Sequence, residues 1–311
     1  MAGMAGMAGM SGQTETRGSS VLSPTLVTAV DDLELAARIV VEGLRTGGHR
    51  SPFRGIGAEF HQHRPYRAGD DLKHLDWKVY ARTNRLYTRQ FRETTNVAVM
   101  LVIDTSASMD FPEGSAASKL RYSILCAAAL AWLAVDQGNA IGLMTLSGSS
   151  MSYLPARSGR VHLRALLAQL DGLKANGIWN PPLAIGRAAE LIQRRGLVMV
   201  LSDFYDQESE TQRELRHVSQ RGHDVAMLQF TTPGERGLPF AGQMNLRDAE
   251  TGQQLLADAE LTGAQYQRAH SGFLARCQHF ARGAGIDYGL FDCSLPPEHT
   301  LRDYLLQRRF S

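Results

Sequence analysis

The sequence predicts an α/β fold, namely a doubly wound, mostly parallel sheet with a smaller N-terminal helical and irregular attachment. From residue 97 onward, short apolar runs of strand length alternate with longer stretches of helical periodicity. Strands that alternate with helices in this way form a parallel sheet covered on both faces. With 311 residues, 43% of them hydrophobic, the chain is long enough for one such domain and an attachment.

The expected elements are spread along the chain in a regular order. We expect strands at 97–103, 139–146, 151–154, 196–201, 224–230 and 286–291. We expect helices at 31–45, 119–137, 159–173, 183–195, 208–221 and 263–282, and a last amphipathic helix within 292–311. Residues 1–30 begin with Met-Ala-Gly three times and turn polar, so we expect a disordered tail. The predicted division is 1–30 tail, 31–95 helix and motif segment, and 96–311 sheet domain.

Oxygen-bearing side chains come directly after two of the expected strands. Asp104, Ser106 and Ser108 stand at every second position after the first strand, and Asp203 comes after the fourth. Ligands of doubly wound sheets bind beyond the carboxyl ends of strands where the strand order reverses, so Asp104 and Asp203 are predicted neighbours. Such oxygens suit Mg²⁺. A purely local alternative is a helix N-cap, since Ser and Asp accept hydrogen bonds from free N–H groups at a helix start.

Several short motifs before the first strand are typical of one family. In order they are Arg-Pro-Tyr at 64–66, Gly-Asp-Asp at 69–71, Asp-Trp at 76–77 and Ala-Arg at 81–82, and then Asp-x-Ser-x-Ser-Met at 104–109. From about residue 54 to 206 the chain resembles the domain-of-unknown-function 58 family, in its soluble subgroup. The resemblance implies a von Willebrand factor A-like protein that acts with a MoxR-type AAA+ ATPase in the assembly or maturation of a client protein.

The Asp-x-Ser-x-Ser spacing is similar to the metal-ion-dependent adhesion site of von Willebrand factor A domains. This implies Asp104, Ser106, Ser108 and Asp203 as ligands of Mg²⁺ (or Mn²⁺/Ca²⁺), with a partner's Glu or Asp completing the coordination. The Gly-Thr of relatives is replaced by the run Gly-Ile-Trp-Asn-Pro-Pro at 177–182, so the expected hydroxyl is missing. Asn180 is the candidate substitute, because hard cations accept amide oxygens. A metal-free remnant of the site is the alternative.

A histidine-rich segment suggests a rival metallohydrolase site. It contains His61, His63, Asp70, Asp71, His74 and Asp76. Catalytic zinc uses imidazole and carboxylate ligands, but no His-Glu-x-x-His pattern is present. Ordinary turn chemistry is the alternative: Gly69 makes a turn, Asp70 or Asp71 caps the next segment, Asp76 bonds locally and Trp77 packs under the sheet.

Positive charge is concentrated before the sheet domain. Residues 45–92 contain eleven Lys or Arg and four acidic residues, whereas the whole chain has a net charge of only +2. A basic segment can bind nucleic acid or an acidic protein surface. We do not expect nucleic acid as the partner, because the segment has no helix-turn-helix, zinc-finger or RNP signature. A solvated or partner-facing surface is the expectation.

The expected function is a non-enzymatic interaction module that grips an acidic group through the loops at 104–110, 179–182 and 203–206. The alternative is a metal-dependent hydrolase or phosphatase using the same site, although Ser106 occupies the place of the second aspartate of aspartyl-phosphate enzymes. Nucleotide binding is not expected, since neither glycine-rich phosphate motif is present. Three cysteines without metal spacing, no apolar run of about 18 residues and no signal-like N-terminus predict a cytoplasmic protein.

Overall fold

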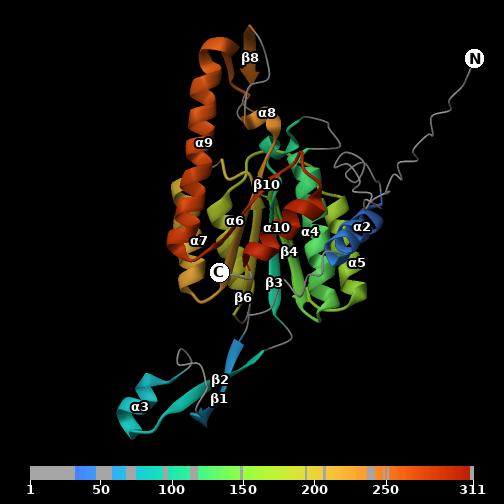
Figure 1. Ribbon diagram of the computed structural model, residues 1–311. Helices are drawn as coiled ribbons and strands as arrows, with labels where there is room; N and C mark the ends of the chain where they lie inside the picture. Colours follow the sequence, from blue (N-terminus) through green and yellow to red (C-terminus); the bar gives the residue numbers. More distant parts are fainter. Residues whose placement is uncertain are drawn as a thin grey trace, which may run out of the picture.

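The structure of the protein is a computed structural model. It describes residues 32–46, 58–67, 75–93, 97–112, 118–147, 150–192, 195–205, 208–236, 242–247, 249–250 and 252–308. Figure 1 shows a central sheet with helices on both sides and a hairpin that extends from one end.

The central sheet has six strands among the described residues, in the order β10-β7-β6-β3-β4-β5. They are β3 (Ala98–Asp104), β4 (Ala140–Ser147), β5 (Ser150–Arg157), β6 (Gly196–Ser202), β7 (Asp224–Thr231) and β10 (Asp287–Asp292). All neighbouring pairs are parallel except β4 and β5, which are antiparallel. The predicted α/β fold with a doubly wound, mostly parallel sheet is confirmed. The edge strand β5 is longer than the predicted 151–154.

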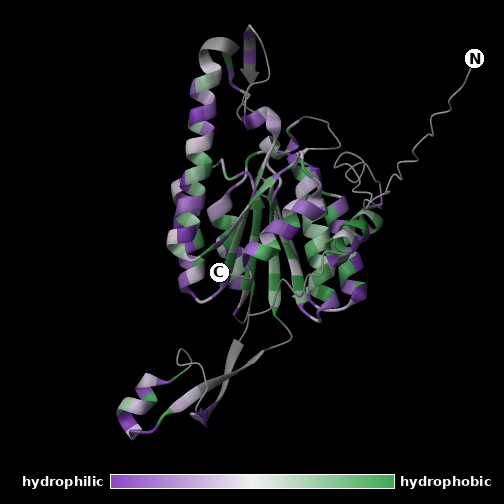
Figure 2. Cartoon of the chain, in the orientation of Figure 1, coloured by the Kyte–Doolittle hydropathy of each residue, from purple (hydrophilic) through white to green (hydrophobic). Residues whose placement is uncertain are grey.

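Helices cover both faces of this sheet, and two hydrophobic cores result. One core lies under α2 (Leu33–Thr46), α4 (Lys119–Asp136), α5 (Arg160–Asp171) and α10 (Pro297–Arg308). The other lies under α6 (Pro181–Leu191), α7 (Glu208–Gln220) and α9 (Ala259–Ala284). Val99 and Leu101 of β3 belong to the first core, and Met100 and Val102 to the second. Side chains alternate along a strand, so a strand buried on both faces is a continuous apolar run, green in Figure 2.

The N-terminal helix α2 packs into the first core, where its apolar face meets α4 and α10. Arg45 at its end forms an ion pair with Asp136 at the end of α4, with 2.5 Å between Nη2 and Oδ2. The predicted helix at 31–45 is therefore confirmed to within two residues. The domain boundaries at residues 30 and 95 stay predictions.

The segment between α2 and the sheet contains an antiparallel hairpin that the sequence did not predict. Strands β1 (Ala58–Pro65) and β2 (Tyr87–Glu93) pair, and α3 (Trp77–Thr83) lies between them in sequence. Trp77 is 62% exposed, so the prediction that it packs under the sheet is wrong. It contacts Tyr80, one turn along α3, edge-to-face. Trp77 cannot reach the central sheet, because α3 and the hairpin lie apart from it (Figure 1).

The remaining elements are short. They are η2 (Ala107–Asp110), α8 (Pro233–Arg236), and the hairpin strands β8 (Gln243–Arg247) and β9 (Gln254–Asp258). Within the described residues, no helix combines the length and hydrophobicity needed to cross a membrane.

Candidate metal site at the ends of β3 and β6

The candidate site lies where two adjacent strands end. β3 and β6 pair in parallel up to Ile103 and Leu201, so their last residues, Asp104 and Ser202, lie side by side at the same end of the sheet. Asp203 comes directly after Ser202. The prediction that Asp104 and Asp203 are neighbours is confirmed, because β3 and β6 are adjacent and the order of the strands along the chain reverses between them.

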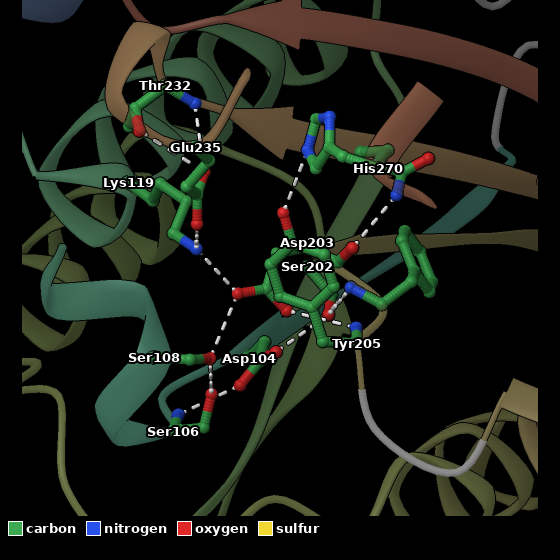
Figure 3. A network of polar contacts seen from close by, with 12 residues as sticks. Asp104, Ser106, Ser108, Lys119, Ser202, Asp203, Tyr205, Thr232, Glu235 and His270 are labelled. Carbon is green, nitrogen blue, oxygen red and sulfur yellow. Dashed lines mark hydrogen bonds and ion pairs between the residues drawn. The ribbon is translucent and has the colours of Figure 1, made fainter. Parts of the chain in front are cut away.

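A continuous chain of hydrogen bonds links the two carboxylates (Figure 3). Ser202 Oγ donates to Asp104 Oδ2 at 2.6 Å, and the Ser106 N–H donates to Asp104 Oδ1 at 2.8 Å. The hydroxyls of Ser106 and Ser108 are 3.0 Å apart, and Ser108 Oγ donates to Asp203 Oδ2 at 2.9 Å. The four predicted side chains from the two loops therefore converge on one place.

The helix-cap alternative accounts for only part of this arrangement. Ser106 is the N-cap residue of η2, but its side chain makes no capping hydrogen bond to that helix. Its hydroxyl is used towards Ser108 instead. Asp104 does accept a local N–H with one oxygen, whereas its other oxygen faces Ser202 on the neighbouring strand. Local capping does not explain why the Ser108 hydroxyl donates to Asp203 in the other loop.

Both carboxylates are removed from solvent, since Asp104 and Asp203 are each 1% exposed. Burial, and then the negative charge of Asp203, raise the pKa of Asp104 to about 7. A buried carboxylate is costly unless a cation or a proton compensates its charge. A cation or a proton bound near Asp104 would therefore stabilise the site.

Asp203 already has a cationic partner, which sequence analysis missed. Lys119, the first residue of α4, lies fully buried with its Nζ 2.7 Å from Asp203 Oδ2 and also paired with Glu235 Oε1. Its Nζ lies 5.0 Å from the ring centre of Tyr205. Burial opposes the charge of Lys119, but the two carboxylates outweigh it and its pKa lies above the usual value. The one available signal was a lysine at the start of a mostly apolar helix.

Residues after β7 hold this lysine in place. Glu235 of α8 accepts hydrogen bonds from the backbone N–H and the hydroxyl of Thr232, at 2.9 and 3.2 Å. On the other side of the site, Tyr205 Oη and His270 Nε2 are 3.1 Å apart. The polar residues labelled in Figure 3 thus come from the ends of β3, β6 and β7 and from η2, α4, α8 and α9.

The loop after β6 has a strained backbone that orients Asp203. Phe204 has a φ of +61°, a left-handed conformation that costs a non-glycine residue about 1–2 kcal/mol. The Phe204 N–H donates to Ser202 Oγ at 2.8 Å, and the Tyr205 N–H donates to Asp203 Oδ1 at 3.2 Å. The tight turn therefore fixes both residues that face Asp104 and Ser108.

The second loop docks beside the site through its backbone. The Ala107 N–H donates to Gly177 O at 3.0 Å, and the Asn176 N–H donates to Thr105 O at 2.8 Å. Asn180 is exposed, and its Oδ1 accepts the Leu183 N–H at 3.2 Å as the N-cap of α6. Its amide oxygen already has this structural task, and its role as a metal ligand stays a prediction.

The donor set fits a hard divalent cation. Asp104, Ser106, Ser108 and Asp203 offer carboxylate and hydroxyl oxygens, and Mg²⁺ prefers oxygen ligands together with several waters. The described part of the chain contains no cluster of three or more His, Cys, Asp or Glu side chains that suits a metal. An ion here would therefore depend on the serine hydroxyls and on water as well as on the two carboxylates.

Comparison with known proteins decides the family. The sequence profile of the family described as "Protein of unknown function DUF58" matches residues 62–272. The chain belongs to the DUF58 family. The predicted family resemblance is thereby confirmed, over more of the chain than the motifs at 64–109 alone cover.

Relatives of this DUF58 protein occur in mycobacteria. The uncharacterized protein Mb1516 of Mycobacterium bovis is 32% identical over 268 residues, which cover 84% of this chain and 83% of the relative. The uncharacterized protein Rv1480 of Mycobacterium tuberculosis shows the same values. These relatives support the family and carry no functional description.

Similar solved structures are more distant. BatB from Bacteroides thetaiotaomicron has a TM-score of 0.46 and 17% identity, with 69% of this chain and all of that chain covered. The SpRpn10 VWA domain has a TM-score of 0.33 and 16% identity, with 43% of this chain and 75% of that chain covered. At these TM-scores the similarities support no argument. The fold is assigned from the strand order of the central sheet.

The rival histidine-rich site of the DUF58 protein has a local explanation. His63 Nε2 and Asp76 Oδ2 are 2.9 Å apart, and Asp76 Oδ1 accepts the N–H groups of Lys78 and Val79 at the start of α3. The prediction that Asp76 bonds locally is confirmed. The side chain of His61 and residues Asp70, Asp71 and His74 lie outside the described residues.

The pKa of Asp76 provides a test of this local arrangement. The hydrogen bond from His63, with those from Val79 and Lys78, lowers it to about 2. Because the folded pKa is depressed, the stabilisation is present above the unfolded value of about 4 and is lost as the pH falls through about 2. We expect His63→Ala to raise the Asp76 pKa measured by NMR titration, and His217→Ala on α7 to leave it unchanged. An Asp76 pKa that His63→Ala does not move would contradict the pairing.

Proposed function

We propose that this DUF58 protein is a non-enzymatic protein-interaction module. Its loops at the ends of β3 and β6 bind an acidic group of a partner through a divalent cation, Mg²⁺, Mn²⁺ or Ca²⁺. The observation that carries the proposal is Asp104, a buried carboxylate whose described contacts are hydroxyl and N–H donors and which lies beside the Lys119-paired Asp203. A cation between these loops would compensate the negative charge of the Asp104 carboxylate.

The side chains of the site have separate tasks in this proposal. Ser106 and Ser108 present hydroxyl oxygens, while Asp104 and Asp203 hold the ion partly through water. Lys119 keeps Asp203 in position by its ion pair. Mg²⁺ takes six oxygen ligands, so four protein side chains leave room for water and for a carboxylate of the partner. The bound cation would supply the electrostatic link to that carboxylate.

The proposed partners are a MoxR-type AAA+ ATPase and a client protein whose assembly or maturation they serve. Membership of the DUF58 family supports this choice. A cytoplasmic location is part of the proposal and is supported by Cys126, Cys277 and Cys293, which are all buried and free. We do not propose a phosphatase, because Ser106 stands where aspartyl-phosphate enzymes carry their second aspartate.

Binding to the ATPase tests the proposed function. The probe is the purified MoxR-type ATPase from the same genome, measured by biolayer interferometry in Mg²⁺ and in EDTA. We expect EDTA and Asp104→Ala each to weaken binding at least about tenfold, which is about 1.4 kcal/mol. Asp171→Ala removes an exposed carboxylate on α5 and serves as the matched control, with unchanged binding expected. Equal binding in Mg²⁺ and EDTA would refute the proposal.

A further inference from the structure

A cavity lies where the edge strand β10 begins, at the amino ends of the parallel strands and therefore at the opposite end of the sheet from Asp104. It has a volume of about 350 Å³ and lies between the ends of α9 and α10 and the start of β10. Its polar lining includes Gln278, Arg282, Asp287, Tyr288, Tyr304 and Arg308. A volume of this size is at the lower end of the range of small-molecule sites.

Two buried hydrogen-bond donors at this cavity lack acceptors. Arg308 is bound on one side, where its Nε lies 2.9 Å from Asp287 Oδ2, and its side chain is only 9% exposed. Its Nη1 and the hydroxyl of Tyr304 are both buried and make no hydrogen bond of good geometry to the described residues. Arg308 approaches the Tyr304 hydroxyl closely enough to favour its ionised form, but a guanidinium only donates, so the hydroxyl proton still has no acceptor. Buried polar groups are nearly always satisfied, so two such donors beside one cavity indicate an acceptor that completes them.

Packing holds the two donors in fixed positions. Tyr304 and Arg308 are four residues apart on α10 and therefore share one helix face. The Tyr304 ring packs on β10 so closely that a Cβ on Gly289 would lie 2.8 Å from Tyr304 Cδ2. Burial raises the pKa of Tyr304 to about 12, against the opposing effect of the neighbouring Arg308, so its hydroxyl keeps the proton that it can donate. The arrangement is preorganised.

The charge of the lining selects the kind of ligand. Arg282 and Arg308 carry two positive charges against the single carboxylate of Asp287. Guanidinium groups bind carboxylates and phosphates through paired N–H donors. We propose that this cavity binds a small molecule with a phosphate or carboxylate group, which accepts from Arg308 Nη1 and Tyr304 Oη and faces Arg282. The proposal does not depend on the metal site.

Titration with inorganic phosphate tests this site. The readout is the broadening of the phosphate ³¹P signal at constant ionic strength, with chloride as the balancing anion. For the wild type we expect saturable binding, and for Arg282→Gln binding about tenfold weaker. Arg268→Gln is the matched control, because it removes the same charge from an exposed position of α9 outside the cavity lining. Its phosphate affinity should equal that of the wild type.

Tyr304→Phe separates a binding role from a structural one. The substitution removes a hydroxyl that has no described acceptor and leaves the packed ring in place. We expect weaker phosphate binding without any loss of thermal stability in the absence of phosphate. Broadening that does not saturate in the wild type would overturn the proposal, as would equal affinities in Arg282→Gln and Arg268→Gln.

Discussion

Replacing Lys119 by methionine is expected to lower the free energy of unfolding by about 3–5 kcal/mol, the cost of breaking a buried ion pair from one side. The ammonium group lies between Asp203 and Glu235, and the Lys119 and Asp203 side chains are each only 1% exposed. Methionine fills a similar volume, so the lower free energy of unfolding would come from the carboxylates of Asp203 and Glu235, which lose their cation, and not from a cavity. Urea unfolding at pH 7 measures it.

An exposed ion pair between α4 and α5 provides the control. Arg121 of α4 lies 3.2 Å from Asp171, with side chains that are 22% and 50% exposed. Surface pairs contribute about 0–1 kcal/mol, so Arg121→Met should cost less than about 1 kcal/mol. The double variant Lys119→Met/Glu235→Gln should recover part of the loss, because it neutralises one stranded carboxylate. A cost below about 1 kcal/mol for Lys119→Met would contradict the buried triad.

The fold was predictable from the sequence because its central strands are buried on both faces. β3 and β6 are apolar along almost their whole length, and Asp104 ends β3 while Asp203 follows β6, so their boundaries were visible. Parallel strands end at the same edge of the sheet, which allowed Asp104 and Asp203 to be placed side by side. The hairpin of β1 and β2 was not predicted, because its sequence has no simple period.

The ion pairs of Lys119 in the site could not be predicted, because they join residues that are far apart in the sequence. Lys119 meets Asp203 and Glu235 across 84 and 116 positions of the chain. Sequence spacing carries no information about such side-chain pairs. Asn180 shows the opposite difficulty, since its amide was assigned to a metal while local geometry makes it the N-cap of α6. An Asn directly before two prolines that begin a helix is typical of a cap.

The largest effect on binding is expected at Asp104. Its carboxylate and the hydroxyls of Ser106 and Ser108 form one side of the proposed ion site, so removal of the carboxylate should lower divalent-cation affinity by about a hundredfold, or about 2.7 kcal/mol. Ser108→Ala removes one hydroxyl donor to Asp203 and should have a smaller effect in the same direction.

Calorimetric titration of Mg²⁺ and Mn²⁺ into the metal-free protein measures this most directly. The wild type and the exposed control Asp171→Ala should each bind one ion with equal affinity, while Asp104→Ala should show about a hundredfold loss. Absence of binding to the wild type, or an affinity that Asp104→Ala leaves unchanged, would contradict a cation held between the ends of β3 and β6.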